Sequence, residues 1–186
     1  RFDTQGAWAA MDKGASQPGT TSDGRLVRSG LEEYIKKGYV PESASITLEY
    51  CNDDFALSQF AKSQGHYEKS VSYQNRAQNW TNLFDVSTGY LRPRLADGAW
   101  MGNFSPTSEK GFTEGTAPQY LWLVNFNLRG LIDKLGGNDQ AFERLDHFFT
   151  KLNAGPRSEF AFMGNEPCEE TPWVYDFASA PWRTQN

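Results

Sequence analysis

Two long stretches without helical periodicity interrupt a chain that otherwise repeats its apolar residues at helical spacing. Residues 85–115 are rich in Gly, Pro, Ser and Thr, and residues 153–171 are rich in Gly, Pro and acidic residues. No segment keeps a period of two, so we expect a mostly α fold. Irregular connections of this length are uncommon inside a compact domain and are usually functional or disordered, and the aromatic content of the first stretch argues against disorder. The sequence therefore predicts helices that carry two functional loops.

The apolar spacing predicts seven helices, most of them joined in pairs by short turns. The expected ranges are 4–14, 30–37, 44–63, 67–84, 117–135, 139–152 and a short helix that opens at Thr171-Pro172. The third and fourth helices, and the fifth and sixth, form αα-hairpins. Hairpins that alternate with long loops indicate an α/α toroid, in which the long loops gather on one face; a plain helical bundle is the alternative. An (α/α)6 toroid has twelve helices, so we expect part of one.

Charge and composition exclude some functions. The chain has 18 Lys and Arg residues against 23 Asp and Glu residues, a net charge of −5, and no basic block. Nucleic-acid binding needs clustered cations, so we expect no nucleic-acid partner. No apolar run approaches the ~20 residues of a membrane span. The two cysteines, Cys51 and Cys168, permit one disulfide and require none.

Aromatic residues make up 15% of the chain, and several fall in segments punctuated by Gly and Pro. Such rings suit sugar binding, and we predict that Trp100 and Phe112 contact a substrate. The alternative is that these rings build small local cores beneath the long loops.

The first loop places a carboxylate, Glu114, between a ring and a glycine just before a predicted helix. Apolar neighbours disfavour the charged form of an acid and raise its pKa, which suits it to donate a proton. Alternatively, Glu114 only caps the helix and interacts with its positive dipole end.

The second loop gathers three carboxylates, Glu166, Glu169 and Glu170, within five residues. They repel one another unless a cation or hydrogen bonds neutralise them, and hard oxygen ligands suit Ca²⁺. A solvated acidic loop is the alternative. His66 and His147 are single histidines without metal-ligand spacing, and the chain has no phosphate-binding loop and no nucleophile elbow.

A series of motifs in order resembles glycoside hydrolase family 92, the calcium-dependent exo-acting α-mannosidases. The matching segments are SASITLEY (43–50), DD (53–54), NLFD (82–85), GYLRPR (89–94), GFTEG (111–115), QY (119–120), GLID (130–133), GG (136–137), GNEP (164–167) and PWRTQ (181–185). Each segment is weak alone, but together they cover nearly the whole chain from Ser43 onward.

The resemblance implies an inverting, exported exo-α-mannosidase that acts on terminal α-mannosides of N-glycans or mannans. Residues 1–186 would form part of its catalytic toroid, with a β-sandwich domain before them and the general base after them, so the isolated chain is expected to be inactive. The alternative is a helical carbohydrate-binding or interaction module without catalysis.

The same resemblance assigns roles to individual residues. Glu114 takes the position of the general acid, and Asn165 and Glu166 that of the leaving-group subsite. Asn165 stands where members specific for α-1,2 linkages are expected to have His. Glu169 and Glu170 fall where the family draws its Ca²⁺ ligands, so Ca²⁺ is the expected cofactor.

Overall fold

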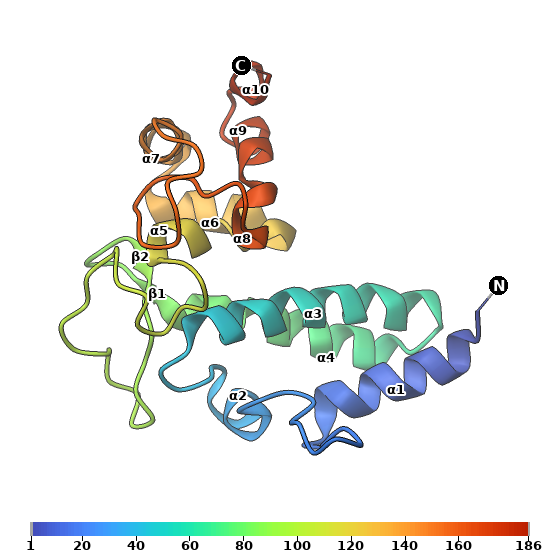
Figure 1. The fold of residues 1–186 in the computed structure, drawn as a ribbon. Coiled ribbons are helices and arrows are strands. Elements are labelled where there is room, and N and C mark those ends of the chain that lie inside the picture. Colours follow the sequence, from blue (N-terminus) through green and yellow to red (C-terminus); the bar gives the residue numbers. More distant parts are fainter. Residues whose placement is uncertain (1, 186) are drawn as a thin grey trace.

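The computed structural model describes residues 2–185 as a mostly helical chain arranged in two stacked groups of helices (Figure 1). The lower group holds α1 (Thr4–Ser16), α2 (Leu31–Lys37), α3 (Ala44–Ser63) and α4 (Tyr67–Ala77), which continues as the 3-10 helix η1 (Gln78–Leu83). The upper group holds α5 (Ala117–Tyr120), η2 (Asn125–Asn127), α6 (Leu128–Leu135), α7 (Asn138–Phe148), α8 (Glu166–Glu169), η3 (Thr171–Trp173), α9 (Val174–Phe177) and α10 (Pro181–Thr184). The expected mostly α class is confirmed, in the form of part of an α/α toroid.

The predicted hairpin of α3 with α4 is present (Figure 1), and α6 and α7 contact each other on either side of the predicted Gly136-Gly137 turn. Gly38 ends α2 in the left-handed conformation, which favours glycine, and a Cβ there would press against the Asn82 side chain. Gly136 ends α6 in the same left-handed conformation.

The predicted helix over 117–135 is wrong as one element, because it is divided into α5, η2 and α6. Asn127 explains the new start, since its side chain accepts a hydrogen bond from Gly130 N–H and caps α6. Asn residues favour such caps over helix interiors. The apolar spacing continued across the break because the connecting Leu121, Trp122 and Val124 are themselves buried. The predicted helix over 139–152 likewise ends earlier, at Phe148.

A short antiparallel hairpin was also missed. Strand β1 (Phe84–Asp85) pairs with β2 (Tyr90–Leu91) at the start of the first long loop. Two-residue strands are too short to show a period of two, so the sequence pattern carried no signal for them.

One apolar core joins the two groups of helices. It includes Leu48 and Trp80 from the lower group and Leu121 and Leu131 from the upper group, all nearly or fully buried. Beside it, the fully buried Asp54 receives paired hydrogen bonds from Arg76 and a third from the Tyr34 hydroxyl at 2.8 Å. This carboxylate therefore ties α2, α3 and α4 together and is a structural group.

The two cysteines are both buried free thiols, and burial raises the pKa of Cys51 to about 12. The optional disulfide is thus not formed. Within residues 2–185, no helix combines the length and apolar character needed to cross a membrane.

Candidate active site

The turn that carries Glu114 is fastened to the start of α3. The first N–H groups of that helix, at Ala44 and Ser45, both donate to the Gly111 carbonyl, at 2.8 and 3.1 Å. These donors have no partner inside the helix, so the loop serves as its cap. Thr113 N–H adds a bond to the Ser45 hydroxyl at 3.2 Å. The GFTEG segment is therefore held against a rigid element.

Glu114 itself adopts a left-handed backbone conformation, with φ of +55°, and its side chain is exposed. The expected apolar enclosure of this carboxyl is absent among residues 2–185. Phe112 lies beneath the turn, only 7% exposed, with its ring 5.5 Å from that of Tyr120. Phe112 therefore supports the turn from the core, and a sugar contact by this ring stays a prediction.

The second long loop meets the first at this turn. Asn165 Nδ2 donates to the Glu114 carbonyl at 2.8 Å. Thr116 donates through its hydroxyl to Ser158 O at 2.7 Å, and Gln119 Nε2 donates to the carbonyls of residues 155 and 160. Two segments about fifty residues apart in sequence thus form one unit, as expected for loops that gather on one face.

An acidic cleft opens beside this unit, with its lining residues drawn chiefly from α3 and from the α8 region. It has a volume of about 240 Å³ and is lined by Glu49, Asn52, Leu123, Asn125, Glu166, Pro167, Glu169 and Glu170. The structure thus places three predicted site residues, Glu166, Glu169 and Glu170, in one cleft.

Two residues of the cleft, both on α3, were not predicted from the sequence. Glu49 and Asn52 lie almost one turn apart on one face of the helix. Asn52 is fixed by donating to Leu48 O at 3.0 Å and to Leu123 O at 3.1 Å. The pKa of Glu49 is raised, first by burial and then by the nearby charges of Asp53 and Glu166. The available signal was a pair of polar residues three positions apart, which places them on the same side of a predicted helix.

Trp100 lies apart from the residues that line the cleft. Its ring is covered by the Arg94 guanidinium, 3.6 Å from the ring centroid, inside the first long loop. This contact matches the alternative of a local loop core, and a substrate contact by Trp100 stays a prediction. Trp173 and Trp182, by contrast, are 60% and 59% exposed.

The donor chemistry of the cleft suits a calcium ion, but the described residues do not complete a site. Carboxylate and amide oxygens are the ligands that Ca²⁺ prefers. Among residues 2–185, however, no three His, Cys, Asp or Glu side chains converge closely enough to hold a metal ion. Glu169 and Glu170 can therefore supply only part of a coordination shell.

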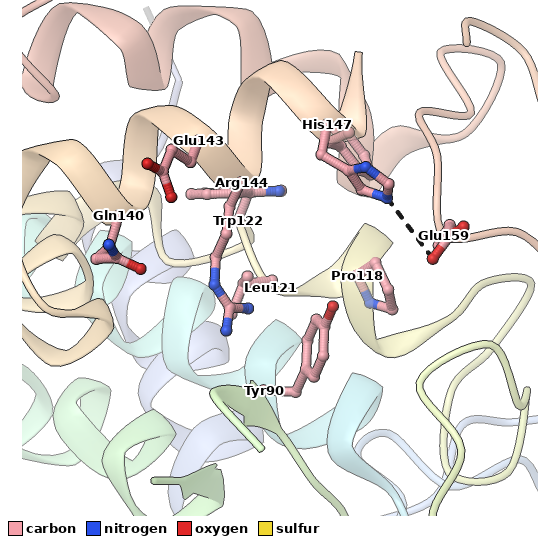
Figure 2. Close-up of a pocket in the computed structure, with 10 residues that line it drawn as sticks. Tyr90, Pro118, Leu121, Trp122, Gln140, Glu143, Arg144, His147 and Glu159 are labelled. Atoms are coloured by element: carbon pink, nitrogen blue, oxygen red, sulfur yellow. Dashed lines mark ion pairs between the residues drawn. The ribbon is translucent and has the colours of Figure 1, made fainter. Parts of the chain in front are cut away.

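Another cavity, of about 180 Å³, lies between β2, α5 and α7 (Figure 2). There His147 Nε2 lies 3.6 Å from Glu159 Oε2, and Arg144 donates to Gly89 O at 3.0 Å. A wider cavity of about 710 Å³ lies between α7 and α10. None of the predicted site residues lines either cavity, so we take the acidic cleft with its adjoining Glu114 turn as the candidate active site.

Comparison with known proteins gives one family. The model of the glycosyl hydrolase family 92 catalytic domain matches residues 1–186. No curated protein sequence gave a significant match.

Solved structures of the same family share the fold. The inverting family GH92 mannosidase BT2199 from Bacteroides thetaiotaomicron superposes with a TM-score of 0.88 at 29% identity, over 99% of this chain and 28% of that one. The family GH92 α-mannosidase BT3965 of the same organism superposes with a TM-score of 0.85 at 34% identity, over 99% of this chain and 24% of that one. A structure of BT3965 in complex with mannoimidazole superposes with a TM-score of 0.84 at 31% identity, over 99% of this chain and 26% of that one. The chain thus spans about a quarter of the length of these proteins.

Proposed function

The chain belongs to glycosyl hydrolase family 92, and on that premise we propose that the parent protein is an exo-acting α-mannosidase. The observation that carries the proposal is the meeting of Glu114 with the Asn165-Glu166 segment at the edge of one cleft. The mannosidase activity named for similar structures, and the mannoimidazole bound in one of them, support a mannose-type substrate.

We assign Glu114 as the general acid that protonates the departing glycosidic oxygen. Its exposed carboxyl stands on a turn tied to α3, so a substrate in the cleft can reach it while its backbone stays fixed. An inverting reaction also needs a base on the opposite face of the sugar, with space for a water between. We assign that base to a part of the parent protein outside residues 1–186.

Glu169 and Glu170 would contribute to a calcium site that other segments complete. Bound Ca²⁺ would coordinate vicinal hydroxyls of mannose and favour distortion of the ring. Glu166 lines the same cleft and Asn165 directly precedes it, and both would face the leaving group. The role of this chain is thus to donate the proton and to bind the sugar on one side.

The test is Glu114→Gln in the complete parent protein. Removing a general acid lowers turnover by roughly 10²–10⁴-fold, but only where the leaving group needs protonation. We expect turnover of unactivated α-mannosides to be lost and that of 2,4-dinitrophenyl α-mannoside to be retained, measured as kcat on both substrates.

Glu68→Gln, at an exposed carboxylate on α4, is the matched control and should change neither rate. Equal activity of the Glu114→Gln variant on both substrates would contradict the assignment. A parent protein that binds mannosides without hydrolysing them would favour the carbohydrate-binding module instead.

A further inference from the structure

Asn165 directs its side chain away from the helix that it begins. As the first flanking residue of α8, it occupies the position where Asn usually accepts a hydrogen bond from the helix N–H groups. Its side chain makes no such bond and instead donates from Nδ2 to the Glu114 carbonyl at 2.8 Å. The side-chain amide of Asn165 therefore holds the first long loop and does not cap α8.

The backbone of Asn165 is itself held on both sides. Its N–H donates to Phe162 O at 2.9 Å, and its carbonyl accepts from Cys168 N–H at 3.0 Å. Cys168 is fully buried. The donor that reaches Glu114 thus projects from a fixed point.

Glu114 needs such support because of its own backbone. A left-handed φ, here +55°, costs a residue other than glycine of order 1–3 kcal/mol, and surrounding contacts must maintain it. The carbonyl before Glu114, at Thr113, accepts the Tyr120 hydroxyl at 2.7 Å, and its own carbonyl accepts Asn165. Side chains from two separate segments thus fix the two peptide groups that flank the Glu114 Cα.

We propose that Asn165 is a positioning residue that sets the direction of the Glu114 carboxyl for proton transfer. This inference rests on the proposed function of Glu114 as general acid. A proton donor must lie within hydrogen-bond reach of the leaving oxygen, and a misplacement of 1 Å can cost about 10²-fold in rate. Asn165 acts through the Glu114 backbone, so its loss weakens only reactions that depend on the proton.

The experiment compares aryl α-mannosides in the complete parent protein, with Asn165→Ala and the isosteric Asn165→Asp. Neither the phenyl nor the 2,4-dinitrophenyl leaving group carries a sugar hydroxyl for Asn165 to recognise, but only the phenolate leaving group needs protonation. We expect kcat for phenyl α-mannoside to fall about ten- to hundredfold, and kcat for the dinitrophenyl substrate to stay within about threefold. The retained dinitrophenyl activity shows that the variants are folded.

Asn75→Ala, which removes an exposed amide on α4, is the matched control and should leave both rates unchanged. Equal losses on both aryl substrates, or no loss on either, would overturn the positioning role. A wild-type parent protein that hydrolyses neither substrate would instead refute the proposed function, so the two failures are distinguishable.

Discussion

Gly115 joins the proposed acid to α5 at a point where no side chain fits. A Cβ at this position would lie 2.9 Å from Tyr120 Cε2. The ring has little freedom to move aside, because its hydroxyl donates to Thr113 O and its face packs near Phe112. The position of the Glu114 turn therefore depends on close contact between a glycine and one aromatic ring.

Gly115→Ala should accordingly damage the turn. Overpacking of this kind costs about 1–3 kcal/mol, and the strain falls beside the acid. We expect a lower melting temperature of the parent protein and a reduced kcat on unactivated α-mannosides. Gly102→Ala is the control, since a Cβ there meets nothing within 4 Å. Equal behaviour of the two variants would show that the ring yields freely.

Single residues of the site differ in how far the sequence could predict them. Glu114 was found because it stands in a glycine-bounded motif, and Glu166 because it belongs to a cluster of three carboxylates; the structure brings their loops together. Glu49 was missed because a single carboxylate on a helix is usually exposed to solvent, and only the folded structure shows that α8 lies opposite it. The sequence likewise could not decide whether Phe112 is buried, because its burial depends on Tyr120, which packs against it from another element.

At the scale of elements, the helix ends at Gly38 and Gly136 were predicted well, whereas α1 runs past Gly14 to Ser16 and the interruption inside an apolar run was missed. The bounds of α3 matched because Pro41 precedes its start and Gly65, with a left-handed φ, follows its end, whereas the division after α5 depends on the side chain of Asn127. The β1–β2 hairpin has its own electrostatic basis. Asp85 is buried and pairs with Arg92 at 2.9 Å, and Arg92 also donates to Met101 O.

The hairpin should lose stability in acid. Burial alone would raise the pKa of Asp85, but hydrogen bonds from Ser87 and Arg92 outweigh it and hold the pKa below its ordinary value. A lowered folded-state pKa gives stability that is present above the unfolded value near 3.8 and is lost as pH falls through the folded value.

Replacing one partner of a buried pair typically costs about 3–5 kcal/mol, because the remaining charge is left unpaired. Asp85→Ala should thus lower the free energy of unfolding of the parent protein, measured in urea titrations at pH 7, and should lower it by less at pH 3. A deficit that is independent of pH would mean that packing, and not the carboxylate charge, is what the hairpin needs.

At the scale of the whole molecule, the acidic cleft forms where the two groups of helices face each other. α3 supplies Glu49 from the lower group, and the α8 region supplies Glu166, Glu169 and Glu170 from the upper group. Like charges in one cleft disfavour each other's ionised forms, and the raised pKa of Glu49 reflects this in part. The packing of the two groups therefore leaves a concentration of negative charge that a cation would relieve.

Calcium should therefore stabilise the parent protein and restore its activity after chelation. A ligand that binds only the folded state adds about 2.7 kcal/mol at a concentration 100 times its Kd, so the melting temperature should rise with Ca²⁺. Glu170→Gln removes a proposed ligand and should weaken this shift, whereas Glu68→Gln on α4 should not. Melting curves with EDTA and with added Ca²⁺ measure the effect independently of turnover. If EDTA changes neither the melting temperature nor the activity, hydrogen bonds or protonation must neutralise the cleft, and the calcium assignment fails.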